Sequence, residues 1–372
     1  MKKVWDVEKI IFKKMSKVNF KNRVIALTIG GMKTKFLYLL CLPFLVVALF
    51  TGCKSGSDVY VAGWENDYEL GKIVATLWKN GKTQYLTDGN ENGFSEAHSV
   101  YVSGNNVFVA GWKENSDGVY KIATLWKNGI AQYLTDGSKH AEAHSVFVSG
   151  EDVYVVGYEQ EYYIDEDLYE LPNNVAKVWK NGAVQNLTDG SLDAEAHSVF
   201  VSRNDLYIVG YEGYGVAKLW KNGESYDLED GTEAYSVHVS GKDVYIAGVY
   251  LNHLKLWKNG IEQNFAERGW GEISSVSISG KNVYVAGWDK KDAWSKSVAM
   301  LWKNDKKQAL TDGNKTASAH SVFVSGKDVY VVGYEEDKRD NGTPVAKLWK
   351  NGKEQKFIEG NVRSKAFSVF VK

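Results

Sequence analysis

Four histidines occupy the same position of a repeated Ala-His-Ser-Val segment, and imidazole serves proteins both as a metal ligand and as a general base. They are His98, His144, His197 and His320. A metal ion needs its ligands within about 2.0–2.3 Å, whereas one histidine per repeat is spread around a ring several units wide. We therefore predict no metal site and no cofactor. We expect these histidines to have a structural role, hydrogen-bonding within or between repeats.

A second recurrent position carries an aromatic side chain in six of seven copies, mostly followed by an acid. Flat rings beside carboxylates can stack on sugars and accept hydrogen bonds from hydroxyls. The alternative is that the rings wedge between structural units. The aromatic residues at this position are Trp64, Trp112, Tyr158, Tyr211, Trp288 and Tyr334. Four further candidates for ligand contact lie in or beside irregular segments: Tyr162, Tyr163, Trp270 and Trp294.

One segment, residues 265–272, departs from its neighbours, and catalytic sites usually break the symmetry of a repeat. It contains Glu267 and Glu272, which form a candidate carboxylate pair for glycoside hydrolysis. A diverged turn is the alternative explanation. The repeats contain no Gly-x-Ser-x-Gly, His-Glu-x-x-His or phosphate-loop motif. An enzyme is therefore the less favoured hypothesis.

The elements that must position these residues follow from a seven-fold repeat. Each copy contains a tryptophan in a Leu/Val-Trp-Lys-Asn frame, and the spacings are 48, 53, 41, 37, 45 and 47 residues. Such spacing is typical of one propeller blade. The frame tryptophans, which we expect in the core, are Trp78, Trp126, Trp179, Trp220, Trp257, Trp302 and Trp349.

Each repeat reads as four short strands joined by Ser-Gly and Asn-Gly turns, without helical periodicity. The array begins at residue 58 with second-strand sequence and ends at residue 371 with first-strand sequence. This predicts an all-β, seven-bladed propeller of four-stranded antiparallel blades, closed by the C-terminal strand pairing with the N-terminal blade. The tight turns should share one face. The longer connections, including the insertion at 160–174, should share the other, where binding usually occurs.

The repeats Trp-Lys-Asn-Gly and Ser-Val-x-Val-Ser-Gly-x-Asp-Val-Tyr-Val resemble those of propeller lipoproteins from Bacteroidota-type bacteria. They are loosely similar to WD-repeat and kelch-like propellers. The WD resemblance implies that each histidine is tied to a serine and to the third-strand tryptophan. These resemblances support a prediction of the fold more strongly than a prediction of the function.

The N-terminal region resembles a bacterial lipoprotein signal. A basic start, an uncharged run over 36–50 and Thr-Gly precede Cys53, which the resemblance implies is lipidated. We interpret residues 1–31 as a mis-assigned upstream extension, 32–52 as the signal peptide, 53–57 as a tether and 58–372 as the propeller. The expected location is the bacterial cell envelope, most simply the outer membrane, with the lipid bilayer as one partner.

Charge limits the remaining partners. Without residues 1–52 the chain has 35 basic and 44 acidic groups, a formal charge of −9. A phosphate backbone would be repelled on average, so we expect no nucleic-acid partner. The favoured function is a non-catalytic, monomeric envelope lipoprotein whose propeller face binds a glycan, peptide or protein. The alternatives are a glycan-active hydrolase or lyase with a site near 265–272, and a structural scaffold subunit of an envelope complex.

Overall fold

The computed structural model describes residues 56–67, 71–87, 93–164, 170–251, 253–263, 265, 270–304, 306–337, 342–358 and 362–372. The chain divides into two compact units, Met1–Gly56 and Ser57–Lys372. The predicted extension, the signal peptide and Cys53 lie outside the described residues. Within the described ranges, no helix is long and apolar enough to cross a membrane.

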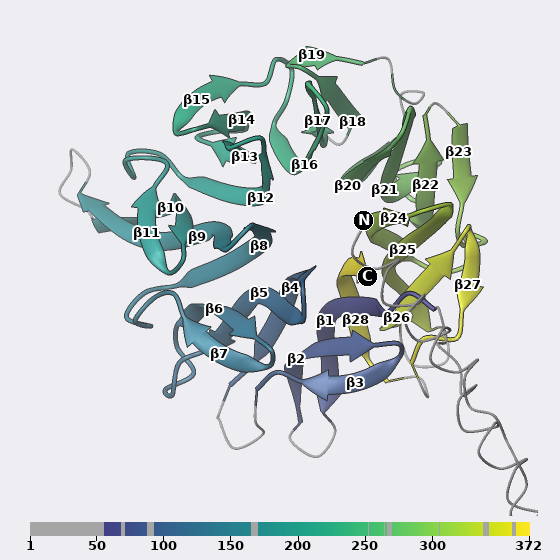
Figure 1. Cartoon of the computed structure of the whole chain (residues 1–372), viewed down its shortest axis with the longest axis horizontal. Helices are drawn as coiled ribbons and strands as arrows, with labels where there is room; N and C mark the ends of the chain where they lie inside the picture. The colour runs from purple at the N-terminus through teal and green to yellow at the C-terminus, as the bar shows by residue number, and fades with distance from the viewer. Residues whose placement is uncertain are drawn as a thin grey trace, which may run out of the picture. The chain divides into compact units, whose positions relative to one another are not determined.

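Ser57–Lys372 forms seven four-stranded antiparallel sheets arranged in a ring, which confirms the predicted seven-bladed propeller (Figure 1). Blade 1 contains β28 (Ser364–Val371), β1 (Val59–Asp67), β2 (Lys72–Lys79) and β3 (Lys82–Tyr85). Blade 2 contains β4 (Ser95–Ser103), β5 (Asn106–Glu114), β6 (Lys121–Lys127) and β7 (Ile130–Tyr133). Blade 3 contains β8 (Ala141–Ser149), β9 (Asp152–Ile164), β10 (Glu170–Lys180) and β11 (Ala183–Asn186). Blade 4 contains β12 (Ala194–Ser202), β13 (Asp205–Glu212), β14 (Val216–Lys221) and β15 (Glu224–Asp227).

The remaining blades repeat the pattern. Blade 5 contains β16 (Glu233–Ser240), β17 (Asp243–Tyr250), β18 (His253–Lys258) and β19 (Ile261–Glu262). Blade 6 contains β20 (Trp270–Ser279), β21 (Asn282–Lys290), β22 (Val298–Lys303) and β23 (Lys306–Ala309). Blade 7 contains β24 (Ala317–Ser325), β25 (Asp328–Asp337), β26 (Thr343–Lys350) and β27 (Lys353–Gln355).

The ring closes as the incomplete repeats predict. The C-terminal strand β28 pairs antiparallel with β1, from Val59 opposite Val371 to Glu65 opposite Ser364. Asp58 and Lys372 also exchange two backbone hydrogen bonds of 2.9 Å. Closure therefore pairs the inner edge of β1 with the tail of the same chain.

Hydrophobic packing lies between neighbouring blades. The seven frame tryptophans are at most 1% exposed, and each packs among alanine and valine side chains of its own and an adjacent blade. Small residues in the first and second strands leave room for the indole rings. Each blade therefore needs a neighbour to bury its tryptophan.

The first strands, which surround the axis, are linked by a complete ring of hydrogen bonds. In every blade the hydroxyl of the serine in the Ser-Val pair accepts the backbone N–H of the equivalent valine in the following blade, at 3.1–3.4 Å. The serines are Ser99, Ser145, Ser198, Ser236, Ser275, Ser321 and Ser368. Each bond crosses a blade boundary, so the ring holds the inner strands at a fixed spacing.

A β-bulge interrupts each first strand one residue before this serine. In blade 3, for example, the register shifts between Ala143 and Ser145, so His144 is the extra residue. The bulge brings the carbonyl of Glu142 so close to β9 that a Cβ on Gly157 would lie 1.9 Å from it. Glycine is therefore required at this position, and the bulge redirects the residue at its centre.

The tight turns share one face, as predicted. The asparagine of each Asn-Gly or Asn-Asp turn donates its side-chain amide to the Asp or Asn that begins the second strand, as in Asn181 Nδ2 to Asp152 Oδ1 at 2.8 Å. We call this end of the strands the tight-turn face. The opposite end, with the second-to-third connections and the links between blades, is the variable face.

The insertion in blade 3 differs from the predicted loop. β9 and β10 continue through it as a long hairpin that pairs Gln160 with Asn174 and Tyr162 with Pro172. Tyr162, Tyr163 and Ile164 are of types that favour strands and allow the pairing to extend, and residues 165–169 lie outside the described part.

Replacing Ser236 with alanine should destabilise the ring. Its hydroxyl accepts the N–H of Val276 at 3.1 Å, and Val276 is 4% exposed, so the substitution leaves a buried donor unpaired. We expect a loss of about 1–2 kcal/mol in the free energy of unfolding, measured by urea denaturation. The matched control is Ser240→Ala at the tight-turn end of the same strand. Equal stability of both variants would contradict a role for the serine ring.

A candidate ligand site at the centre of the ring

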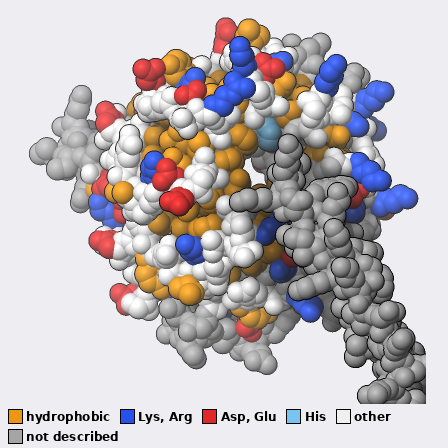
Figure 2. Space-filling view, viewed as in Figure 1, with side chains coloured by type: hydrophobic (Ala, Val, Ile, Leu, Met, Phe, Trp, Pro, Cys, Tyr) orange, Lys and Arg blue, Asp and Glu red, His pale blue; other side chains and the backbone are white. Residues whose placement is uncertain are grey.

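The bulges direct seven side chains toward the hollow at the centre of the ring. Figure 2 shows a hollow at the centre of the ring, bordered by apolar side chains. The seven residues at the bulge position are His98, His144, His197, Tyr235, Ser274, His320 and Phe367.

Six of these side chains are in ring-to-ring contact around an arc. His144 lies between His98 and His197, with ring centroids 5.6 and 5.4 Å away. The arc continues from His197 to Tyr235 at 5.5 Å, and from His98 through Phe367 to His320 at 5.5 and 5.3 Å. Histidines on adjacent blades are thus neighbours. Although each blade supplies one histidine, His98, His144 and His197 are close neighbours, contrary to the wide separation expected from the sequence.

Two residues before the bulge, five consecutive blades carry a glutamate. These are Glu96, Glu142, Glu195, Glu233 and Glu272, whereas blades 7 and 1 carry Ser318 and Lys365. Since the first strand begins at the variable face, the glutamates lie at the variable-face end of the hollow. The rim of the hollow is therefore acidic over blades 2–6.

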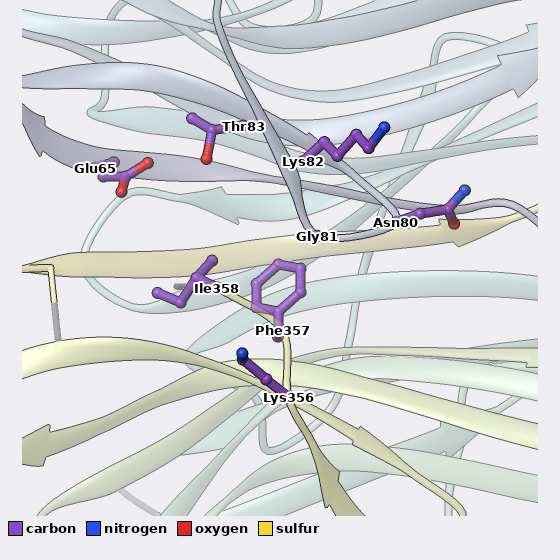
Figure 3. Close-up of a pocket in the computed structure, with 8 residues that line it drawn as sticks. All are labelled: Glu65, Asn80, Gly81, Lys82, Thr83, Lys356, Phe357 and Ile358. Atoms are coloured by element: carbon purple, nitrogen blue, oxygen red, sulfur yellow. The ribbon is translucent and has the colours of Figure 1, made fainter. Parts of the chain in front are cut away.

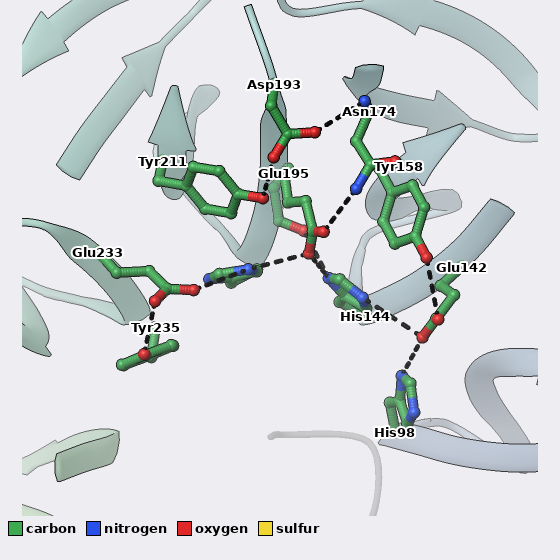
Figure 4. A network of polar contacts seen from close by, with 12 residues as sticks. His98, Glu142, His144, Tyr158, Asn174, Asp193, Glu195, Tyr211, Glu233 and Tyr235 are labelled. Atoms are coloured by element: carbon green, nitrogen blue, oxygen red, sulfur yellow. Dashed lines mark hydrogen bonds and ion pairs between the residues drawn. The ribbon is translucent and has the colours of Figure 1, made fainter. Parts of the chain in front are cut away.

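Glu142 is the most heavily contacted of these carboxylates (Figure 4). Its Oε1 accepts hydrogen bonds from Lys121 Nζ at 2.6 Å and from the Tyr158 hydroxyl at 3.0 Å. Its Oε2 faces His144 Nε2 at 3.7 Å and His98 Nδ1 at 4.0 Å. Burial opposes its ionisation, but the two histidines and Lys121 outweigh burial and hold the pKa of Glu142 well below its ordinary value.

The histidines are oriented by the backbone of the next blade. Nδ1 of His144, His197 and His320 donates to the carbonyl of Ala196, Ala234 and Ala366, at 3.3, 3.2 and 2.9 Å. His98 instead contacts Glu96 Oε2 through Nε2 at 3.2 Å. Burial alone would lower the pKa of His98, but this bond and the charges of Glu142 and Glu96 raise it above the ordinary value.

This arrangement differs from the one implied by the WD-repeat resemblance. The serine beside each histidine is bonded to a valine N–H, as described above. Among the described residues, the indole N–H groups of Trp78, Trp126, Trp179, Trp220 and Trp349 have no hydrogen-bond partner. The histidine-serine-tryptophan connection is therefore wrong, because the bulge directs the imidazole into the hollow and away from the core.

The aromatic residues that end the second strands lie across from the acidic position. Glu96, Glu142, Glu195 and Glu272 are aligned with Trp112, Tyr158, Tyr211 and Trp288, whereas Ser318 and Lys365 are aligned with Tyr334 and Trp64. Cross-strand partners share one face of a sheet. For the four rings aligned with a glutamate, the neighbouring carboxylate thus comes from the adjacent strand, because the residue that follows the ring in sequence points to the other face.

These aromatic residues are mostly enclosed. Trp64 and Trp112 are 4% and 5% exposed, and their rings contact Arg363 and Lys121, with distances of 5.6 and 4.2 Å from the ring centroids. Tyr211 donates its hydroxyl to Asp193 Oδ2 at 2.7 Å. The tryptophans of blades 1 and 2 therefore have little open face for a sugar.

Exposed apolar side chains gather elsewhere. Of the fifteen large ones among the described residues, six lie on the outermost strands and nine on the variable face. The nine are Phe94, Val119, Tyr162, Leu192, Tyr214, Tyr250, Leu251, Trp270 and Trp294. Three were predicted to contact ligand: Tyr162 is 46% exposed, Trp270 49% and Trp294 95%. The side chain of Tyr163 lies outside the described part of the chain.

The predicted carboxylate pair is only half described. Glu267 lies outside the described residues, whereas Glu272 lies in β20 at the acidic rim. Burial and the charge of Glu233 raise the pKa of Glu272. The diverged segment is the link between blades 5 and 6. There, Phe265 takes the core position of a leucine and packs against Trp302, with ring centroids 6.1 Å apart.

A second cavity, of about 600 Å³, lies between blades 7 and 1 (Figure 3). Glu65 lines it and is 7% exposed, and its Oε2 has no hydrogen-bond partner among the described residues. In blade 3 the equivalent Glu159 pairs with Lys177 at 2.7 Å, but the position of that lysine is taken in blade 1 by Thr76. Burial without a cation raises the pKa of Glu65.

Three solved structures illustrate the similarity of this fold to known proteins. A puromycin-hydrolyzing peptidase of Mycobacterium tuberculosis has 11% identity and a TM-score of 0.53, with 81% of this chain and 52% of the peptidase covered. An acylaminoacyl peptidase bound to a chloromethyl ketone has 13% identity and a TM-score of 0.50, with 80% and 50% covered. The β-propeller domain of the Trilobed protease from Pyrococcus furiosus has 10% identity and a TM-score of 0.49, with 81% and 92% covered.

The chain spans about half the length of the two peptidases. Identities this low show a shared fold alone. No protein-family profile matches the sequence, and no curated protein matches it.

Nearer the tight-turn face, a second arc of aromatic rings contains one histidine. His238 contacts Phe200 with ring centroids 4.9 Å apart, and burial lowers its pKa to about 4. Equivalent positions in blades 3, 4, 7 and 1 hold Phe147, Phe200, Phe323 and Phe370.

Replacing His238 with phenylalanine should therefore reduce acid sensitivity. The folded-state pKa of His238 is about 4, below the ordinary value of 6.5. Between these two pH values the unfolded chain binds more protons than the folded chain, so the free energy of unfolding decreases as the pH is lowered. The free energy of unfolding of His238→Phe minus that of the wild type, measured by urea denaturation, should be about 2 kcal/mol more favourable at pH 4.5 than at pH 7. Parallel pH profiles would show that His238 is not the titrating group.

Proposed function

We propose that this protein is a non-catalytic binding protein that holds a peptide or protein segment on the variable face of its propeller. The observation that carries the proposal is the placement of exposed apolar side chains. Nine lie on the variable face, including all the exposed aromatic residues outside the outermost strands, whereas the other six lie on the outermost strands, where Ile130 and Ile261 directly follow the tight Asn-Gly turns. Exposed aromatic side chains grouped on one face of a rigid frame are typical of an interaction surface.

The acidic rim supports a ligand with a basic side chain. In blades 5 and 6, Glu233 and Glu272 have on average fewer lysine and histidine partners than the glutamates of blades 2–4. Among the described residues, Glu233 contacts only Tyr235 at 2.7 Å and His197 at 3.6 Å. The charge of Glu233 helps to raise the pKa of Glu272. A lysine or arginine entering here would relieve the repulsion between the two carboxylates. A basic residue flanked by apolar residues is therefore the proposed recognition element.

We place this activity at the bacterial cell envelope, with a lipid on Cys53 as the anchor. The support is the sequence pattern before Cys53 and the resemblance of the repeats to Bacteroidota-type lipoproteins. Cys53 precedes Ser57, the first residue of the propeller unit, by four positions in the sequence.

The proposal predicts selective capture of basic peptides. The full chain in detergent, screened against a peptide array, should retain peptides with Lys or Arg beside an apolar residue, and affinity should fall as salt rises. Glu233→Gln combined with Glu272→Gln, or Trp294→Ala alone, should weaken binding about tenfold or more, measured by fluorescence anisotropy.

The control is Glu151→Gln, which removes an acid from the tight turn between β8 and β9 on the opposite face. This variant should bind like the wild type. Loss of binding in the control to the same extent, or retention of glycans but no peptides on parallel arrays, would overturn the peptide proposal.

A second candidate function is glycan hydrolysis, favoured by one observation. Glu272 is a half-buried carboxyl with a raised pKa, as a general acid requires near neutral pH. If this candidate is correct, the full chain will cleave oligosaccharides in a polysaccharide panel, and Glu272→Gln will lower the rate about 100-fold or more. Absence of cleavage, or an unchanged rate in the variant, would exclude it and favour binding without catalysis.

A further inference from the structure

We propose that His98, Glu142 and His144 bind a divalent transition-metal ion of the zinc class at the rim of the hollow. One ligand atom from each residue lies within 4.8 Å of the others. The site joins blade 2 to blade 3 and goes beyond the peptide binding proposed above.

The ligand atoms converge on one point. Glu142 Oε2 lies 4.0 Å from His98 Nδ1 and 3.7 Å from His144 Nε2. Bonds of about 2.0–2.2 Å from zinc to nitrogen and oxygen place tetrahedral ligand atoms roughly 3.5 Å apart. Small side-chain movements would therefore complete the site.

In each of the three residues, the nitrogen or oxygen that faces away from the proposed ion already has a polar partner. The atom that faces the ion is therefore available as a ligand. His144 Nδ1 donates to the Ala196 carbonyl, and His98 Nε2 contacts Glu96 Oε2 at 3.2 Å. Glu142 Oε1 accepts from Lys121 and Tyr158. Outer contacts of this type fix the tautomer and orientation of metal-binding histidines.

The overlapping group of His144, Glu195 and His197 is the weaker arrangement. It would use His144 Nδ1, which faces Glu195 Oε2 at 4.0 Å but donates its proton to Ala196 at 3.3 Å. A metal ligand nitrogen must be free of a proton. His144 can therefore serve the first group without breaking a bond to the backbone.

Charge and access also fit a divalent cation. Glu96, Glu142 and Glu195 together with the nearby Lys121 have a net charge of −2 when the histidines are neutral. The side chains of His98, Glu142 and His144 are 18%, 13% and 16% exposed, so an ion can reach them from the hollow. Two imidazoles with one carboxylate suit zinc and its first-row neighbours and leave a fourth position for water.

The test is metal titration of the full chain in detergent after treatment with a chelator. Calorimetry with Zn²⁺ should give one ion per chain, and Co²⁺ should give the visible absorption of a low-coordinate site with histidine ligands. His144→Asn should weaken Zn²⁺ binding at least about 100-fold, because the asparagine amide can replace Nδ1 as donor to Ala196 but supplies no Nε2.

The matched control is His320→Asn in blade 7. His320 makes the same Nδ1 bond to a backbone carbonyl, but Ser318 replaces the glutamate two residues earlier. This variant should bind Zn²⁺ within about threefold of the wild type. Substoichiometric binding to the wild type, or equal loss in both variants, would overturn the proposal.

Should His144→Asn fail to fold, Glu142→Gln decides the question. Zn²⁺ should raise the melting temperature of the wild type and not that of Glu142→Gln, and an equal rise in both would refute the site. Peptide capture measured in excess chelator separates the two proposals, since it uses Glu233, Glu272 and the exposed aromatic residues and not the metal.

Discussion

The hydrogen bond from one serine hydroxyl to the valine N–H of the next blade, repeated seven times around the axis, is the constraint on which the rest of the structure depends. It sets the distance between first strands, and every first strand is bulged one residue before it. The bulge rotates one side chain out of the sheet and toward the axis. Without equal spacing and equal bulges, residues at the same repeat position would not meet. The ring of bonds is thus the reason that side chains separated by one whole blade in sequence form one site.

The residues that maintain the fold are the same in every blade, whereas the side chains at the rim differ from blade to blade. Tryptophan, serine and glycine recur in all seven blades because packing and close approach require them. The residues at the rim do not recur in this way. Blades 2–4 combine glutamate with histidine, blades 5 and 6 keep the glutamate with Tyr235 or Ser274, and blades 7 and 1 bring Ser318 and Lys365. The glutamates of the rim are therefore well paired in blades 2–4 and less well paired in blades 5 and 6.

The fold could be predicted from sequence because its signals are local and repeated. The tryptophan spacing gives the number of blades, and the tail at residues 367–371 gives the closure. The rim could not be predicted, since the distance between adjacent first strands comes from packing and not from spacing along the chain. The pairing of rings with acids shows the same limit. Glu65 follows Trp64 in sequence but points to the opposite face, whereas Lys365 of a distant strand is aligned with that ring. A glycine at the same position of every second strand, followed by an aromatic residue in six of the seven blades, was the available signal for the bulge.

The acidic rim must cost stability, because carboxylates removed from water are unfavourable unless they are paired. In blade 3 the cost is offset by Lys121, Tyr158 and two imidazoles around Glu142. Near blades 5 and 6 the offset is weaker, and Glu272 responds with a raised pKa. A closed ring with seven packed interfaces can carry this cost, since no blade can relax without disturbing its neighbours. Natural proteins tend to leave such unfavourable arrangements at functional sites. The least compensated part of the rim lies on the same face as Trp270 and Trp294, which is the face that we propose for the ligand.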